Sequence, residues 1–258
     1  MRKSFFSLIP FLLVGLLAAD AFAQSASDED IKTVGLSGDL GLAVFSQSAI
    51  IQGNNSTTQV RPYAYFDYDR FFARIDTFGI KTIPLGAGSL ELVGKYNPEG
   101  YIARGTPYNL MNPRSLPTPL GLGTFQLTPV GAFFFHTYQD VSTSKGKMAE
   151  FTYAGEIDLR NAIKIYPLIG FDYKDKQYLN YFYGVSLSES QRSGVNTYTP
   201  ESGTSPFAAM IIEVPVGEHW VVNTLVKQKW LATSISNSPL VNERRVENLF
   251  ISLNYRFE

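Results

Sequence analysis

The sequence predicts an all-β transmembrane protein: an antiparallel up-and-down β-barrel of twelve strands, with ten strands as the alternative. Three observations lead to this prediction. The chain begins with an export signal, many segments alternate apolar and polar residues, and the composition is rich in aromatic residues but poor in charge. Alternation with a period of two places apolar side chains on one face of a strand, which fits a wall between lipid and a wet lumen.

The composition supports a membrane environment. Of the 258 residues, 14% are aromatic and only 17% are charged, whereas roughly 25% charged residues are typical of soluble domains. No apolar stretch beyond the N-terminal one is long enough for a spanning helix. The formal net charge of −1 offers no basic surface for nucleic acid, and the lack of cysteine removes disulfides as a source of stability. An aromatic-rich soluble β-sandwich is the alternative that composition leaves open.

The first 23 residues have the three parts of a secretory signal peptide. Two basic residues precede an apolar run, and Ala21-Phe22-Ala23 places small residues at the cleavage positions. We expect cleavage before Gln24, which leaves residues 24–258 as a single outer-membrane barrel domain.

Charged residues recur at every second position in the first predicted strands, which begin near Leu36 and continue over residues 58–68, 71–76 and 89–96. Unpaired charges are costly in a dry core, but a hydrated lumen lets acidic and basic side chains pair. We therefore predict that the following residues point into the lumen: Asp39, Arg61, Asp67, Arg70, Arg74, Asp76, Glu91 and, from a later strand, Lys164.

Residues 97–119 interrupt the pattern. Several prolines and little periodicity predict a long loop, because proline cannot serve a central ladder. Long loops are normal on the outer side of barrels. Arg104 and Arg114 in this loop are expected to be solvated, with docking into the lumen or contact with a partner as alternatives.

Alternation resumes near Gly121 and continues to the C-terminus. The predicted strands cover about residues 121–128, 131–136, 150–158, 163–173, 178–185, 206–214, 218–231 and 249–257. A long polar loop, residues 186–203, separates two of them.

Trp220 and Trp230 share a face of one predicted strand. They lie about 33 Å apart along the strand, or about 25 Å apart in height at a tilt of roughly 40°. This spacing predicts that they mark the two membrane interfaces, where Tyr255 and Phe257 of the last strand are further interface aromatics.

Three consecutive motifs stand at the end of the predicted strand 178–185 and in the loop after it: Tyr183-Gly184-Val185-Ser186, Gln191-Arg192-Ser193-Gly194 and Tyr198 to Gly203. On these residues the chain resembles the MipA/OmpV family of outer-membrane proteins, named for MltA-interacting protein. Leu120-Gly121-Leu122-Gly123, Ser238-Pro239 and the ending Tyr-Arg-Phe are also similar. Residues 46–56 depart from the family in lacking a Pro-x-Tyr-x-Gly-Ser turn, and the chain ends one residue after the aromatic.

The resemblance implies a non-enzymatic scaffold in the outer membrane. It implies a lytic murein transglycosylase and a murein synthase as partners, contact with outer-membrane lipid, and no cofactor. Because binding residues concentrate on loops held by rigid scaffolds, the residues expected to contact a partner are those of the motif: Tyr183, Gly184, Arg192, Ser193, Gly194, Tyr198 and Gly203.

Two other functions remain open. The row of charged residues in the lumen fits a narrow pore for small solutes. A lipid-modifying enzyme would need a histidine beside a nucleophile. His136, expected near a strand end, and His219, expected in a turn, have no recognisable nucleophile motif, and two histidines without cysteine make no structural zinc site.

Overall fold

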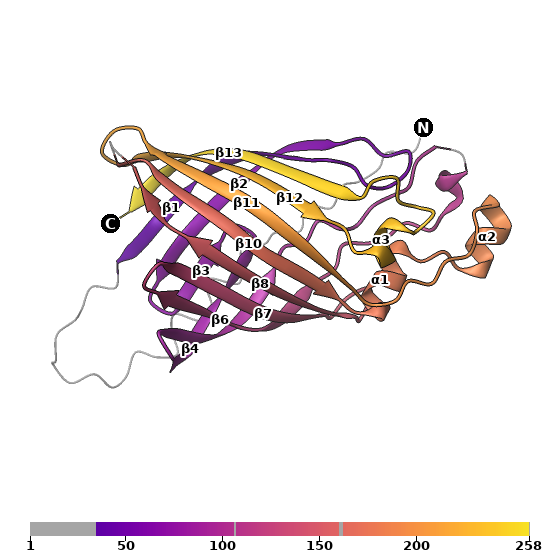
Figure 1. The fold of residues 1–258 in the computed structure, drawn as a ribbon, viewed down its shortest axis with the longest axis horizontal. Coiled ribbons are helices and arrows are strands. Elements are labelled where there is room, and N and C mark those ends of the chain that lie inside the picture. Colours follow the sequence, from indigo (N-terminus) through magenta and orange to yellow (C-terminus); the bar gives the residue numbers. More distant parts are fainter. Residues whose placement is uncertain (1–34, 106, 160–161, 258) are drawn as a thin grey trace, which may run out of the picture. The chain divides into compact units, whose positions relative to one another are not determined.

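The computed structural model describes residues 35–105, 107–159 and 162–257. The predicted signal peptide, residues 1–23, lies outside the described residues. The described chain forms one closed antiparallel sheet (Figure 1). Two of its segments, β8 and β9, both pair with β10 and together make one strand of the wall, so the barrel has twelve strands. The predicted fold class and strand number are confirmed.

The strands follow one another around the barrel in chain order. Their bounds are β1 Leu36–Gln47, β2 Thr57–Tyr68, β3 Phe71–Arg74, β4 Thr77–Leu85, β5 Gly88–Lys95, β6 Pro119–Thr128, β7 Gly131–Asp140, β8 Lys147–Gly155, β9 Ile157–Asp158, β10 Lys164–Lys174, β11 Gly203–Pro215, β12 Trp220–Trp230 and β13 Arg245–Phe257. The short helices are η1 Tyr108–Leu110, α1 Lys176–Tyr183, α2 Leu187–Ser193 and α3 Thr233–Ser236.

The last strand closes the barrel. β13 pairs with β12 on one side and with β1 on the other, in a register that runs from Gly38 opposite Phe257 to Gln47 opposite Asn248. Closure leaves the ring without the two free sheet edges that an open sheet would expose, and unpaired backbone groups in hydrocarbon cost several kcal/mol each.

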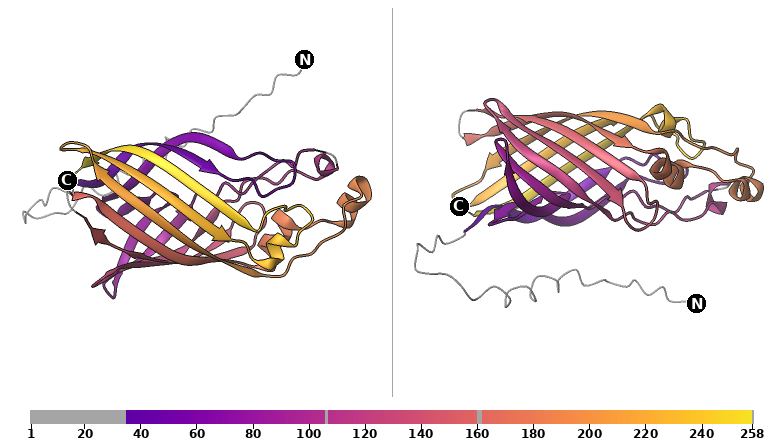
Figure 2. Two further views of the ribbon diagram at one scale, coloured as in Figure 1. Left: turned by 45° about the horizontal axis from the view of Figure 1, so that its top comes forward. Right: turned by 90° about the horizontal axis from the view of Figure 1, so that it is seen from below.

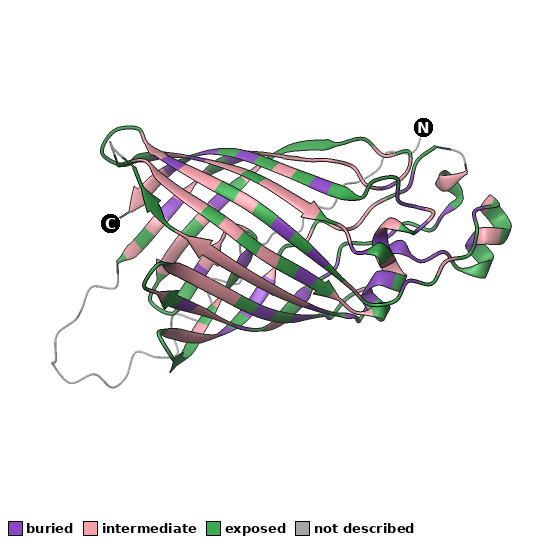
Figure 3. Cartoon of the chain, in the orientation of Figure 1, coloured by how far each residue is buried: buried purple, intermediate pink, exposed green. Residues whose placement is uncertain are grey.

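Apolar side chains cover the outside of the wall. On β13, Leu249, Ile251 and Leu253 are 43–53% exposed, whereas Phe250 and Ser252 between them are 2% exposed. The same alternation of exposed and buried positions runs along the strands in Figure 3. An exposed apolar face around a closed sheet is the surface that lipid solvates.

Two segments differ from the prediction. Residues 77–85, which the sequence analysis left without a strand, form β4, whose pairing with β5 shifts register between Lys81 and Pro84 and so disturbs the alternation. Residues 178–185, predicted as a strand, instead form most of α1 and a single bridge at Val185. One missed strand and one false strand offset each other in the predicted count.

The two ends of the barrel differ in their connections, as Figure 2 shows. At the end where β1 begins and β13 ends, short turns join the strands, for example at residues 69–70, 86–87 and 129–130. We call this the short-turn end. The opposite, long-loop end carries η1 and the three α-helices. Within the described ranges, no helix has the length and apolar character needed to cross a membrane.

Candidate functional site

Three segments gather at the long-loop end, and we call them the loop cap: residues 97–118 (without 106), 175–203, whose last residue begins β11, and 231–244. Figure 1 shows α1 and α3 beside the strand ends and α2 farther out. The loop cap contains the residues 183–203 that carry the family resemblance, so the expected partner-contact residues belong to this end.

Helix α1 packs into a hydrophobic core at the long-loop end. The Asp175 carboxylate accepts a hydrogen bond from Tyr178 N at 2.8 Å and caps the helix. Tyr178, Leu179 and Phe182, spaced for one helical face, are fully buried. Ile235 of α3 belongs to the same core. The loop cap is therefore a packed structure, held by burial of large side chains.

Glu99 joins three parts of this region. Its carboxylate accepts hydrogen bonds from Tyr178 Oη at 2.5 Å and Tyr183 Oη at 2.7 Å, and it forms an ion pair with Lys174. Burial by itself raises the pKa of Glu99, but the Lys174 ammonium and these hydrogen bonds prevail and lower the pKa to about 2. The charged carboxylate of Glu99 thus links loop-cap segment 97–118 to α1 and to the end of β10.

A second buried ion pair links loop-cap segment 97–118 to α2. Arg114 Nη2 lies 2.9 Å from Glu189 Oε1, with the two side chains 8% and 3% exposed. Glu189 also forms a capping box with Ser186, because each side chain accepts a hydrogen bond from the other residue's backbone N–H. Burial raises the pKa of Glu189, but the hydrogen bonds from Ser186 and the charge of Arg114 lower it overall. Arg114 is therefore buried in the loop cap, whereas Arg104 is exposed.

Four of the motif residues lie within the loop cap. Tyr183 is 2% exposed, and a Cβ on Gly184 would meet a helix carbonyl at 2.4 Å. A Cβ on Gly203 would lie 2.3 Å from Ser234 Oγ, and the hydroxyl of half-buried Tyr198 donates to Ser234 O at 3.0 Å. These contacts give the four residues a packing role within the loop cap.

The other three motif residues end α2. Arg192 is exposed and donates to Asn112 Oδ1 at 2.8 Å. The Ser193 hydroxyl donates to Glu189 O at 2.7 Å. Gly194 is exposed and adopts φ +75°, the left-handed conformation that commonly ends helices. Arg192 and Gly194 are therefore the motif residues that α2 leaves open to solvent.

Most of the residues predicted to line the lumen are paired with opposite charges. Arg74 and Asp67 pair with each other, and residues not predicted to line the lumen, such as Arg256 and Lys95, complete the other pairs. The N···O contacts are Arg256–Asp39 at 2.7 Å, Arg256–Glu213 at 2.9 Å, Arg74–Asp67 at 2.7 Å, Lys81–Asp67 at 2.6 Å, Lys95–Asp76 at 3.2 Å and Lys95–Glu150 at 2.6 Å.

Three other predicted lumen residues lie elsewhere or lack such a pair. Lys164 pairs with Glu156 at 2.6 Å, and both are solvent-accessible near the short-turn end. Arg70 lies exposed in the turn between β2 and β3. Among the described residues, Arg61 has no acidic partner within ion-pair distance; its neighbours are aromatic.

Glu91 and His136 meet across an intervening strand. Their side chains are buried, and His136 Nε2 lies 3.2 Å from Glu91 Oε2. Between them on β6 lies Gly123, where a Cβ would fall 1.9 Å from the His136 ring. The absence of a side chain at this position lets the imidazole lie over β6. His136 is therefore in the middle of β7 and not near a strand end, as predicted, and the nearby Gly-Leu-Gly signature acquires a packing role.

The predicted interface aromatics lie at opposite ends of the wall. Trp220 and Trp230 begin and end β12 and are 46% and 42% exposed. At the short-turn end, the Trp220 ring lies 5.6 Å from that of Tyr255, which lies 5.0 Å from that of Phe257. Exposed aromatics at both ends of an apolar band are the arrangement that membrane interfaces favour.

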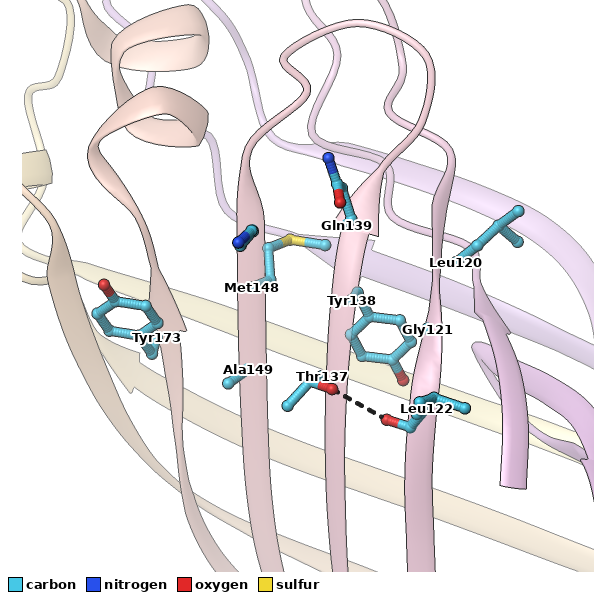
Figure 4. Close-up of a pocket in the computed structure, with 10 residues that line it drawn as sticks. Leu120, Gly121, Leu122, Thr137, Tyr138, Gln139, Met148, Ala149 and Tyr173 are labelled. Atoms are coloured by element: carbon cyan, nitrogen blue, oxygen red, sulfur yellow. Dashed lines mark hydrogen bonds between the residues drawn. The ribbon is translucent and has the colours of Figure 1, made fainter. Parts of the chain in front are cut away.

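A shallow groove of about 390 Å³ lies on the lipid-facing side of the wall (Figure 4). It runs over the small residues Thr137 and Ala149, between the larger side chains of Leu122 and Tyr173. Most of its lining residues occupy outward-facing positions, so the groove belongs to the lipid-facing surface of the wall.

Among the described residues, no group of three His, Cys, Asp or Glu side chains is placed to hold a metal ion. The His219 ring lies beside the Tyr255 ring, tilted by 31°, with 5.4 Å between ring centroids. The features with a clear geometry are therefore the buried loop cap, the paired charges of the lumen and the exposed short turns.

Comparison with known proteins agrees with this geometry. Two relatives named "Putative outer membrane protein YiaT", from Escherichia coli strain K12 and from O157:H7, are 23% and 24% identical over 210 residues, which is 80% of this chain and 85% of theirs. The MltA-interacting protein of Escherichia coli K12 is 26% identical over 95 residues, covering 37% of this chain and 38% of its own length.

The family match covers nearly the whole barrel. Residues 40–257 match the family described as MltA-interacting protein MipA. The matched range begins in β1 and ends with the last residue of β13, so it includes every strand of the wall and the loop cap. With outer-membrane proteins among its relatives and a closed β-barrel as its fold, this chain belongs to the MipA family and is an outer-membrane protein.

Proposed function

We propose that this outer-membrane barrel is a non-enzymatic scaffold for murein-hydrolysing and murein-synthesising enzymes, and that it contacts them at the short-turn end. Family membership and the name of one relative, MltA-interacting protein, support a murein transglycosylase as one partner. The observation that supports this surface is that the short turns lie at the end of the barrel where β1 begins and β13 ends, opposite the long loops.

Barrel topology assigns the two ends to two compartments. Outer-membrane barrels place short turns in the periplasm and long loops outside the cell. Murein and its enzymes lie in the periplasm, so a murein partner meets the short turns. The motif residues of the loop cap, such as Arg192 and Gly194, then face the outside of the cell. The proposed contact with a murein partner therefore lies at the short-turn end and not at these residues.

The short-turn end offers exposed side chains for such a contact. Val130 is 73% exposed in the turn between β6 and β7, and Val216 is 53% exposed after β11. Arg70 is exposed in another turn, and Lys164 and Glu156 stand exposed at the same end. The turns at this end thus carry both apolar and charged side chains, and small, transient interfaces use both kinds.

Site-specific photocrosslinking in intact cells tests this function and its surface together. A photoreactive amino acid replaces Val130 at the short-turn end or, as the matched control, Leu187, which is 66% exposed on α2. We expect a murein transglycosylase or synthase to be captured from position 130 and not from position 187. Capture from 187 alone would reverse the assignment of the ends, and capture of neither enzyme from either position would contradict the scaffold.

A narrow pore is the second candidate, because charged residues line the lumen. The buried core of the loop cap lies at the long-loop end, so a pore would also need a passage through or beside the loop cap. Recordings in lipid bilayers test this: channel events in folded protein support a pore, and their absence even after proteolytic removal of the loop cap opposes it.

A further inference from the structure

The shallow groove on the lipid-facing wall lies where small side chains interrupt a row of larger ones. The strand register aligns four outward positions across β6, β7, β8 and β10: Leu122, Thr137, Ala149 and Tyr173. Thr137 and Ala149 are the small members, and the larger Leu122 and Tyr173 project on either side of them (Figure 4). The volume of about 390 Å³ falls within the range of ligand pockets. The structure therefore leaves open space at this place in the wall.

Aromatic rings follow the groove toward the middle of the wall. The next outward positions along β7, β8 and β10 are Phe135, Phe151 and Phe171, which the register also places side by side. The rings of Phe151 and Phe171 are stacked, with 5.6 Å between their centroids, and Phe135 and Phe171 are exposed. A hydrocarbon chain that leaves the groove in this direction therefore meets further apolar surface.

The end of the groove nearer the long loops is polar. Gln139 and Lys147 face each other across β7 and β8, one outward position beyond the small residues, and both are exposed. Gln139 Nε2 donates to Lys145 O at 3.4 Å, so this end adjoins the loop between β7 and β8. Figure 4 shows that the Tyr173 ring directs its hydroxyl toward the same end. Tyrosine is favoured where an apolar ring and a polar tip meet lipid and water, which places this end at a membrane interface.

Lys147 has a charge that can bind a ligand. Within the part of the chain that the structure describes, none of the ion pairs includes Lys147, whereas Lys176 at the same end pairs with Glu201 at 2.7 Å. Asp175 is close, because its N–H donates to Lys147 O at 3.0 Å, but its carboxylate accepts from Tyr178 N and caps α1. An exposed ammonium at the polar end of an apolar groove is complementary to an anionic group on a hydrocarbon chain.

In a membrane, the groove and the charge contribute differently to binding. Lipid chains are as apolar as the wall, so no hydrophobic driving force favours one lipid over another in the groove. A lysine near the membrane surface, in contrast, favours an anionic headgroup about fivefold. Selection of a lipid therefore depends on the charge of its headgroup, whereas the groove determines where its chain lies.

We propose that the groove over Thr137 and Ala149 binds a phospholipid with a net negative headgroup. One acyl chain lies in the groove between Leu122 and Tyr173, and the headgroup phosphate accepts a charge-assisted hydrogen bond from Lys147 Nζ. The site faces the membrane and is independent of the murein scaffold proposed above.

Photolabelling with two diazirine-bearing lipids tests the site. The folded full-length mature protein is placed in phosphatidylcholine vesicles that contain a small fraction of phosphatidylglycerol or of phosphatidylcholine with a diazirine in the acyl chain. The labelled residues are mapped by mass spectrometry. We expect the phosphatidylglycerol probe to label Thr137, Ala149 or Tyr173 about fivefold more than the phosphatidylcholine probe does.

Three variants separate the charge from the groove. Lys147→Gln should abolish the preference for phosphatidylglycerol. Lys176→Gln is the matched control, because it removes an exposed lysine at the same end that is already paired, and it should preserve the preference. Ala149→Leu fills the groove without altering the charge, so it should reduce the labelling of Thr137 by both probes.

Each other outcome overturns the proposal. Equal labelling of the groove by the two probes would show ordinary contact with bulk lipid. Loss of the preference in both lysine variants alike would show a general attraction of the long-loop end for anions. Absence of label in the groove would mean that another occupant, such as a second copy of the chain, covers it. The ratio of the two probes on the unaltered protein decides the question even if a variant fails to fold.

Discussion

The long-loop end and the short-turn end of this barrel use charge in opposite ways. At the long-loop end, the Glu99–Lys174 and Arg114–Glu189 pairs are buried and tie separate loops to one another. Near the short-turn end, Lys164 and Glu156 form an exposed pair on neighbouring strands. A buried pair is destabilising to break, whereas an exposed pair contributes little.

The two ends therefore differ in which of their charged side chains are exposed and able to bind another molecule. Many polar groups of the loop cap make hydrogen bonds or ion pairs within it. The family motif residues there therefore serve mainly to pack the loop cap. At the short turns, side chains such as Val130 and Arg70 are exposed and can contact other molecules. The short-turn end, whose exposed side chains are not required for packing, is therefore the better candidate for a partner-binding surface.

The largest expected effect comes from Glu99→Gln. It leaves the Lys174 ammonium without its counter-charge and weakens the hydrogen bonds from Tyr178 and Tyr183. We expect a loss of about 3–5 kcal/mol in the free energy of unfolding, measured by urea denaturation from lipid vesicles, together with faster proteolysis of the loop cap. A Glu99→Gln variant as stable as the parent would contradict the claim that buried ion pairs stabilise the long-loop end more than exposed pairs stabilise the short-turn end.

Acid should loosen the loop cap selectively. The pKa of Glu99 lies at about 2, below its ordinary 4.5, so its contribution is complete above about pH 4.5 and is lost as the pH falls toward 2. The full shift corresponds to roughly 3 kcal/mol. Limited proteolysis at successive pH values should show cleavage within residues 97–118 rising over this interval, before cleavage at the short turns. Simultaneous cleavage at both ends would contradict a local role for Glu99.

A change in the middle of the wall should affect both ends alike. Gly123→Ala places a methyl group against the His136 ring and separates it from Glu91. We expect a loss of about 1–3 kcal/mol from overpacking. Adding His136→Ala should recover part of it, as a double-mutant cycle of unfolding free energies would measure. Strictly additive effects would mean that the two residues do not share this space.

The smallest effect is expected at the short-turn end. Glu156→Gln removes the partner of Lys164, and both side chains are more than a third exposed. We expect a change in the free energy of unfolding of no more than about 1 kcal/mol by the same urea measurement as for Glu99→Gln. A loss as large as that of Glu99→Gln would erase the distinction between the ends.

The sequence was most informative where lipid and lumen impose a simple period. β13 and β12 were predicted within a few residues, because apolar residues recur at every second position along most of each strand. β4 was missed because a register shift near Pro84 breaks its alternation. α1 was misassigned because its aromatic residues look strand-like, although Asp175 before it and the spacing of Tyr178, Leu179 and Phe182 fit a capped helix.

The site was harder to predict than the fold. His136 and Glu91 are far apart in sequence, and only the register of β5, β6 and β7 shows that they meet over Gly123. Motif residues such as Tyr183 looked like a recognition surface because sequence alone does not distinguish a packed loop from a free one. β3 pairs with β2 only from Tyr65 to Tyr68, and its short length follows from tertiary pairing and not from local pattern.

The pairing of Gly38 with Phe257 has a consequence for biogenesis. The two strands that seal the cylinder lie at opposite ends of the barrel sequence, so the seal waits until both have been synthesised. Until then both strands present bare edges that invite aggregation. We therefore expect the unsealed chain to be prone to aggregation in water, and this tendency to end when the ring closes.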